Sequence, residues 1–158
     1  MKKCLLFLSV VVLVIGLSSG KTFAQNTSSS YRTGLGLGVD FGDGATMVGI
    51  SGKHFFTDHN VGEANLMFFN GGAGINVLYE YHSDITGAAG LKWYAGLGPE
   101  LLFGKHYTDF DIRPLIGLDY KIRAAPFALS FDWRPLFSLT HGTDFLAARF
   151  GLGIRYAF

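Results

Sequence analysis

The segment Thr33-Gly34-Leu35-Gly36-Leu37-Gly38-Val39-Asp40-Phe41 has an apolar side chain at every second position from Leu35 onward. Side chains of a β-strand point alternately to its two faces, so this segment has one apolar face and one face of glycine and aspartate. Gly42-Asp43-Gly44 follows at once, and these residue types favour a tight turn. We therefore predict a strand that ends in a turn at residues 42–44.

The same pattern recurs along the rest of the chain. Seven further segments carry apolar side chains in one alternating phase, and turn residues separate them. They cover residues 46–56, 61–70, 75–81, 91–103, 110–122, 127–137 and 150–158. An even number of antiparallel strands brings both ends to one side, and closing the sheet removes its exposed edges. We predict an all-β fold, an antiparallel up-and-down barrel of eight strands over residues 31–158.

The charged residues distinguish the two faces of these strands. Fourteen lie in the phase opposite the apolar side chains, and the apolar phase of the strand bodies contains none. They are Asp40, Lys53, Glu63, Glu80, Lys92, Glu100, Asp111, Arg113, Asp119, Lys121, Asp132, Arg134, Arg149 and Arg155. A charge that faces lipid at the bilayer centre costs about 2–4 kcal/mol. The pattern therefore predicts a transmembrane barrel with its apolar phase toward lipid and its charges inside.

The inward charges are balanced in sign. An eight-stranded barrel has room for side chains and little else, and an isolated buried charge is costly. We therefore predict a packed interior with a structural network of ion pairs. Its predicted members are Lys53, Glu63, Glu80, Lys92, Glu100, Arg113, Asp119, Lys121, Asp132, Arg134, Arg149 and Arg155. Within it, Glu63, Glu80 and Glu100 are expected to pair with Lys53, Lys92, Arg113, Arg134, Arg149 or Arg155.

A soluble barrel with the opposite orientation is the main structural alternative. Lipocalin-like proteins place apolar residues inside, around a ligand, and polar residues outside. Periodicity alone does not say which face is which. Here the apolar phase includes Trp93, Trp133 and many phenylalanines, which would leave little cavity inside. We therefore favour the membrane barrel.

The first residues have the three parts of a secretory signal peptide. Met1-Lys2-Lys3 is basic, residues 4–17 are apolar, and small residues lead to Ala24. The apolar run is shorter than the roughly 20 residues that a spanning helix needs. We predict a signal peptide at residues 1–24, cleaved near Ala24, and a short tail at residues 25–30. The single cysteine, Cys4, lies in this leader, so disulfides are not expected in the mature chain.

The final segment, Phe150-Gly-Leu152-Gly-Ile154-Arg-Tyr156-Ala-Phe158, resembles the last strand of bacterial outer-membrane proteins. Together with the leader and the strand count, it makes the chain similar to the small outer-membrane barrels of the OmpX and OmpA membrane-domain type. The resemblance implies that Tyr156 and Phe158 belong to a signal that the outer-membrane assembly machinery recognises. It also implies a monomer in the outer membrane of a Gram-negative cell, in contact with lipid and lipopolysaccharide. Members of that family usually have long outer loops, whereas the connections here are short, which argues against a loop-based adhesin.

Few residues suggest chemistry. The best candidates for a lipid-modifying enzyme or a metal site are His106, Asp109, His141 and Asp144 in two later loops, with Ser138 nearby. A nucleophile needs a base and an orienting acid within hydrogen-bond reach. Loop histidines and aspartates are usually only solvated, and the chain has no His-x-Ser pair of the lipid A deacylase type.

These observations favour a structural protein over an enzyme. A net charge of +1 without a basic patch predicts no nucleic-acid partner. We predict a non-enzymatic role in envelope integrity, with no cofactor, no metal and no catalytic residue. A narrow porin-like conduit for small solutes is the first alternative, and a lipid-modifying enzyme is the second.

Overall fold

The computed structural model describes residues 31–140 and 145–158. The predicted signal peptide at 1–24 and tail at 25–30 lie outside these ranges, as do His141 and Asp144. The described residues form ten strands: β1 (Thr33–Gly42), β2 (Met47–Phe55), β3 (Asn60–Phe69), β4 (Gly72–Asp84), β5 (Leu91–Gly104), β6 (Thr108–Lys121), β7 (Phe127–Trp133), β8 (Leu136–Ser138), β9 (Phe145–Leu146) and β10 (Arg149–Ala157). The described ranges contain no helix long and apolar enough to cross a membrane.

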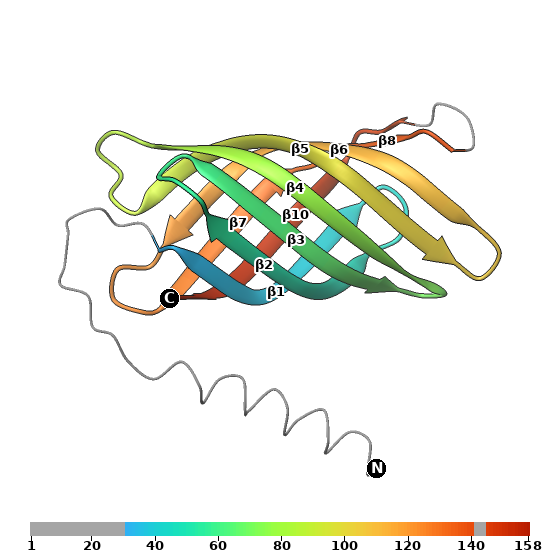
Figure 1. The fold of residues 1–158 in the computed structure, drawn as a ribbon, viewed down its shortest axis with the longest axis horizontal. Helices are drawn as coiled ribbons and strands as arrows, with labels where there is room; N and C mark the ends of the chain where they lie inside the picture. Colours follow the sequence, from blue (N-terminus) through green and yellow to red (C-terminus); the bar gives the residue numbers. More distant parts are fainter. Residues whose placement is uncertain (1–30, 141–144) are drawn as a thin grey trace, which may run out of the picture.

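The strands form one closed antiparallel barrel (Figure 1). Each strand from β1 to β6 pairs with the next in sequence, β10 pairs with β7, and the β1–β10 pairing closes the ring. The short strands β8 and β9 extend the same sheet at the end away from the C-terminus. The predicted closed barrel of eight antiparallel strands is therefore confirmed.

The predicted strand at residues 127–137 consists of two parts, β7 and β8, which corrects that continuous segment, whereas the final predicted segment at residues 150–158 corresponds to the continuous strand β10. The pairs Ile116↔Trp133 and Ile112↔Phe137 have the same register, so Pro114 and Pro135 lie opposite each other between them. Proline has no backbone N–H, so the ladder between β6 and β7–β8 is interrupted there.

A β-bulge separates β9 from β10. Arg134 N donates to Arg149 O, whereas Leu136 pairs with Leu146, so the final strand has one extra residue in this interval. The carbonyl oxygen of Ala147, within the bulge, accepts a hydrogen bond of 2.6 Å from Trp133 Nε1. The indole N–H thus provides a hydrogen bond to a carbonyl group that the bulge leaves without a partner strand.

The apolar phase faces outward and the charged phase faces inward. Leu37 and Ile154 on the outside are 57% and 49% exposed, whereas Arg113 and Arg155 on the inside are each 1% exposed. This arrangement is the opposite of a lipocalin-like barrel, whose interior is apolar.

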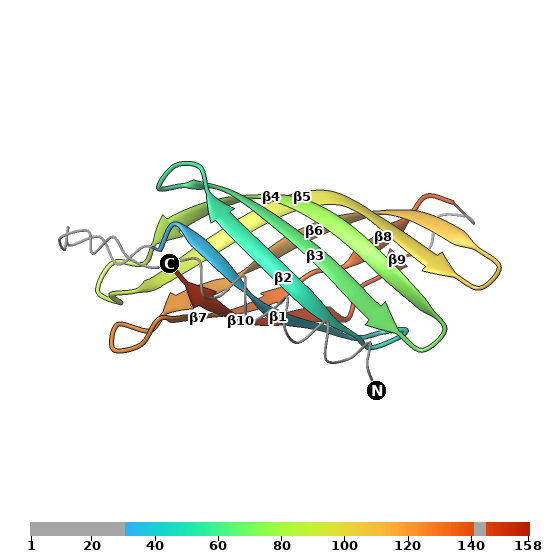
Figure 2. The same cartoon turned by 60° about the horizontal axis from the view of Figure 1, so that its bottom comes forward.

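The strands are staggered and run obliquely to the long axis of the barrel (Figure 2). Following hydrogen-bonded neighbours once around the barrel from Arg32 leads back to Gly42, ten residues further along the chain. Such a stagger is linked to a strand tilt of roughly 35–45°. It determines which inward side chains reach the same level of the barrel.

Two apolar clusters occupy part of the interior. Tyr31, Phe55, Val61, Ala128 and Ala157 pack together at the end where the termini of the barrel lie, with the Tyr31 and Phe55 rings 5.0 Å apart. Leu78, Tyr94 and Leu115 form the second cluster. The interior is therefore packed with apolar as well as charged side chains.

Glycine on the inner face of β1 allows β10 to approach closely. A Cβ at Gly36 would lie 2.0 Å from the carbonyl oxygen of Ile154 and 2.7 Å from the Cα of Arg155. At Gly38 the nearest atom would be the Cβ of Ser51 at 3.5 Å, an ordinary contact. Position 36 therefore requires glycine, and position 38 does not.

We predict that Gly36→Ala lowers the free energy of unfolding by about 1–3 kcal/mol, the usual cost of overpacking. Gly38→Ala is the matched control on the same face, and its effect should stay within about 0.5 kcal/mol. Urea unfolding followed by tryptophan fluorescence measures both. Equal losses in the two variants would contradict this assignment of the β1–β10 contact.

Candidate functional site

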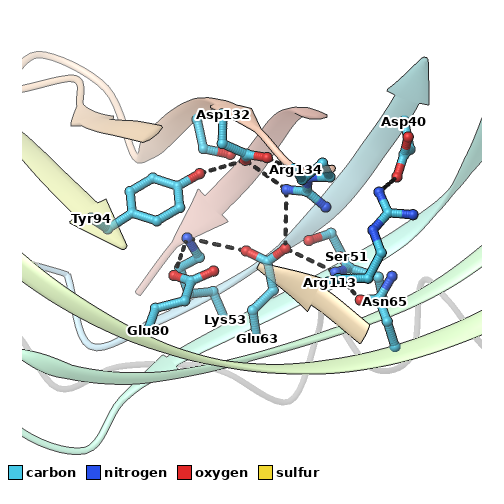
Figure 3. A network of polar contacts seen from close by, with 12 residues as sticks. Asp40, Ser51, Lys53, Glu63, Asn65, Glu80, Tyr94, Arg113, Asp132 and Arg134 are labelled. Carbon is cyan, nitrogen blue, oxygen red and sulfur yellow. Dashed lines mark hydrogen bonds and ion pairs between the residues drawn. The ribbon is translucent and has the colours of Figure 1, made fainter. Parts of the chain in front are cut away.

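The barrel interior contains nearly all of the charged residues that share the polar phase. Of the fourteen, thirteen are buried and Lys121 is half-buried. Most of them join a continuous set of contacts, which we call the interior network (Figure 3). Its members are Tyr31, Asp40, Ser51, Lys53, Glu63, Asn65, Asn76, Glu80, His82, Tyr94, Glu100, Arg113, Asp119, Ser130, Asp132, Arg134, Arg149 and Arg155.

Glu63 on β3 is the point where the interior network converges (Figure 3). Its carboxylate accepts hydrogen bonds from Arg155 Nη2 at 2.7 Å and from Asn65 Nδ2 at 2.8 Å. It also forms ion pairs with Lys53 Nζ at 3.1 Å and Arg134 Nη2 at 3.7 Å. Three cations around one buried carboxylate offset the cost of removing it from water.

Lys53 connects Glu63 to a second acidic group near the terminal end. Its ammonium lies 2.8 Å from Glu80 Oε2 and 3.7 Å from Asp119 Oδ2, and 4.2 Å from the centre of the Tyr94 ring. Glu80 Oε2 also lies 2.7 Å from His82 Nε2, and the His82 ring stacks on Tyr94 at 4.7 Å. One lysine therefore forms ion pairs with acidic side chains from three strands.

Two asparagines extend the interior network toward the other end of the barrel. Asn65 Nδ2 donates to Asn76 Oδ1 at 2.7 Å, and Asn76 Nδ2 donates to Glu100 Oε1 at 3.0 Å. Glu100 in turn accepts from Arg113 Nη1 at 2.7 Å, and Arg113 Nη2 donates to Asp40. Neutral amides thus connect charged groups that would otherwise be separate.

Arg149 ends this chain of contacts and holds the loop between β1 and β2. Its guanidinium donates to Asp40, to the carbonyl oxygen of Asp43, and to that of Ala45 at 3.1–3.2 Å. Ala148 N donates to Asp43 Oδ2 at 3.0 Å. The first loop at the end away from the termini is therefore fixed to the start of β10.

Asp132 and Arg134 form a close pair on the opposite wall. Arg134 Nη2 donates to Asp132 Oδ2 at 2.6 Å, and Arg134 Nε donates to the other carboxylate oxygen. Tyr94 OH donates to Asp132 Oδ2 at 2.6 Å. The Arg134 guanidinium packs against Gly151, where a Cβ would lie 2.2 Å from its Nε. Glycine on β10 thus leaves the space that this arginine occupies.

Two members of the predicted ion-pair network lie outside it. Lys92 forms an ion pair of 3.1 Å with Asp84, whose side chain is 67% exposed. Lys121 donates to the carbonyl oxygens of Ile122 and Ala125, at 2.9 and 2.8 Å, and so closes the turn after β6. Both lysines lie near strand ends, where a backbone carbonyl or an exposed carboxylate is closer than the interior acids.

Each of the three glutamates contacts cations of the set expected for it. Glu63 pairs with Lys53, Arg134 and Arg155, Glu80 pairs with Lys53, and Glu100 pairs with Arg113. Within the described residues, the other two cations of that set, Lys92 and Arg149, pair with aspartates. Arg149 pairs with Asp40 instead, because the stagger places β1 and the start of β10 side by side at that level.

Several network members are uncharged, so the pattern of charges in the sequence did not predict them. Arg155 donates to Ser51 Oγ at 2.9 Å and to Ser130 Oγ at 2.8 Å. Tyr94 lies in the same inward phase of β5 as Lys92 and Glu100. His82, Asn65 and Asn76 lie in the inward phase of their own strands, so the alternation alone could have predicted that these side chains point inward. Tyr31, which donates to Asp119 Oδ2 at 2.9 Å, precedes β1 and had no such signal.

The loop candidates for enzyme chemistry have weak support. His106 is exposed, Asp109 is half-buried, and His141 and Asp144 lie outside the described residues. Within residues 31–140 and 145–158, no group of three or more histidine, cysteine or acidic side chains is arranged to hold a metal ion. In the same ranges, histidine side chains bond to Thr33, Glu80 and a backbone carbonyl, and none bonds to a serine hydroxyl.

Comparisons with protein-family models, curated proteins and solved structures give no match for this chain. The resemblance to small outer-membrane barrels therefore rests on the final strand, the leader and the strand count of the sequence alone.

We predict that Glu100→Ala lowers the free energy of unfolding by about 3–5 kcal/mol, because the buried Arg113 and Arg149 are then left to share the single carboxylate of Asp40, and Asn76 loses its acceptor. Asp58→Ala, in the exposed turn between β2 and β3, is the control and should have little effect. Thermal unfolding followed by circular dichroism compares the two. A Glu100→Ala transition at the wild-type temperature would show that this pair does not stabilise the barrel.

Proposed function

We propose that this chain is a small integral outer-membrane protein with a structural, envelope-integrity role and no enzymatic activity. The leader is removed near Ala24, and the barrel at residues 31–158 spans the outer membrane of a Gram-negative cell as a monomer. The observation that carries this proposal is the segregation of the two faces, apolar outside and charged inside.

The outer face has the chemistry of a surface that meets lipid. Large apolar residues more than a third exposed occur on every strand of the ring, from Leu35 on β1 to Ile154 on β10. A soluble monomer rarely exposes a contiguous apolar patch beyond a few hundred Å². In a bilayer, lipid tails surround this apolar face, and the pairing of strands around the closed ring provides hydrogen-bond partners for the backbone groups.

Aromatic side chains gather on the outer face near the terminal end. They are Tyr79, Tyr81, Trp93, Tyr120, Phe127, Tyr156 and Phe158, all at least 40% exposed. Tyr81 lies 6.2 Å from Trp93, and Phe127 lies 5.8 Å from Tyr156, so the rings form contacts between strands. Aromatic belts of this kind are typical of membrane–water interfaces.

The segment with the proposed assembly signal also closes the barrel. Phe158 N donates to Thr33 O and Thr33 N donates to Phe158 O, both at 2.9 Å, next to the β1–β10 ladder. Tyr156 and Phe158 are 51% and 61% exposed on the outer face. Both aromatic side chains are therefore accessible to the outer-membrane assembly machinery and, after insertion, to lipid.

The interior network supports a structural role over transport. Side chains from opposite walls meet, as Arg113 does with Asp40 and Arg155 with Glu63, and hold the strands together. The alternative, a narrow conduit for small solutes, is favoured by four buried side-chain atoms without a hydrogen-bond partner in the described part of the chain. They are Glu80 Oε1, His82 Nδ1, Asp111 Oδ1 and Lys53 Nζ, the last of which has ion-pair partners. Nothing comparable favours the lipid-modifying enzyme.

If the proposal holds, the mature protein fractionates with the outer membrane and its gel mobility shifts on heating, because the closed barrel resists detergent until it unfolds. Cell fractionation and electrophoresis of heated and unheated samples measure this. Recovery of the native protein as a monomer soluble without detergent would refute the proposal.

Conductance separates the structural role from the conduit. The wild-type protein in planar bilayers should pass little or no steady current, because ion-paired side chains fill the interior. Glu100→Ala, which removes one filling side chain, should pass current more often. A stable, ion-selective current from pure wild-type protein would favour the conduit instead.

A further inference from the structure

A hollow interrupts the apolar outer face at β2 and β3, near the end where the termini of the barrel lie. Its volume is about 440 Å³, within the range of roughly 300–1,000 Å³ that is usual for small-molecule sites. Gly52, Gly62 and Ala64 face outward here with at most one side-chain carbon, and Gly52 pairs with Ala64. Leu35 on β1 and Val77 on β4 bound the hollow on its two sides.

The shape of the hollow depends on these small residues. A Cβ at Gly62 would lie 3.0 Å from Phe56 Cε2, so the Phe56 ring lies over Gly62 and forms one wall. At Gly52 the nearest atom to a Cβ would be Leu35 Cδ1 at 3.7 Å, so that position is open. Phe158 contributes another wall. The hollow thus has apolar walls on several sides.

Only one end of the hollow is polar. Thr33 Oγ1 and His54 Nδ1 lie 2.8 Å apart in a hydrogen bond on the outer face. The other ring nitrogen, His54 Nε2, has no hydrogen-bond partner among residues 31–140 and 145–158. Both residues lie at the strand ends nearest the termini. An apolar trough with one polar end matches the shape and polarity of an amphiphile.

We infer that the hollow binds one acyl chain of a phospholipid from the leaflet nearest the termini, with the head group beside His54 and Thr33. This inference rests on the proposed function, since only a barrel in a membrane meets such chains. An unfilled hollow would forfeit dispersion contacts along its walls, and a flexible acyl chain restores them. The placement of the polar pair at the aqueous end fits a head group at the interface.

A second copy of the chain fits this hollow less well. Two copies related by a twofold axis present the same patch to each other. A contact centred here would therefore set one hollow against the other and leave both unfilled. The phospholipid is the occupant that the shape favours.

The test compares two substitutions that add the same side chain to the outer face. Ala64→Leu fills the hollow, whereas Ala95→Leu places leucine on β5, outside it. Protein purified in mild detergent is titrated with dioleoyl phosphatidylethanolamine, and bound lipid is counted by native mass spectrometry. Wild type and Ala95→Leu should retain one lipid per barrel, and Ala64→Leu should bind it at least tenfold more weakly.

Equal retention by the two variants, or no retained lipid on wild type, would overturn the inference. A wild-type dimer that Ala64→Leu dissociates would also overturn it and assign the hollow to a second copy. Failure of the proposed function is separately visible in fractionation and heat-shifted mobility. A membrane-inserted barrel without retained lipid removes only this inference.

Discussion

Charges inside a closed ring of eight strands have to find their partners within the ring. The interior has width for side chains alone, so an unpaired carboxylate or guanidinium there would bear the full cost of desolvation. Glu63 illustrates how the chain meets this requirement, since lysine and two arginines surround its carboxylate. The neutral amides of Asn65 and Asn76 then connect that group to Glu100 and Arg113. The other features of the barrel follow from the need to bring these groups together.

The positions of the glycines and the stagger of the strands allow the interior charged groups to reach one another. At Gly151 the missing side chain leaves space for the Arg134 guanidinium, and at Gly36 it lets β10 approach β1. The stagger of ten residues tilts the strands and sets distant positions at one level. Arg113 and Asp40, which are 73 residues apart in sequence, meet for this reason. Small residues and tilt thus make the ion pairs possible in so narrow a space.

The side chains of the outer face, unlike the charges inside, need no polar partners if lipid surrounds them. Most of it is bulky and apolar, and it has many exposed aromatic rings. The hollow at Gly52, Gly62 and Ala64 departs from this pattern. Under the proposed function, this trough with one polar end would hold a single lipid while the interior network keeps the ring closed. The two faces would then act independently: the interior for stability and the exterior for lipid.

The alternation in the sequence by itself determined the number of strands, their antiparallel order and the phase of each side chain, because a strand exposes residues to its two faces with a period of two. It therefore placed Asp40, Arg113 and Arg155 on the same face as Glu63 without the structure. It could not assign partners, because those depend on the stagger of the closed ring and on contacts across it. Tertiary structure alone paired Arg149 with Asp40, placed Lys92 beside Asp84 and Lys121 on a turn, and brought Tyr31 to Asp119. The interruption at Pro114 and Pro135 likewise needed the register of β6 and β7, because one proline alone does not show that another lies opposite.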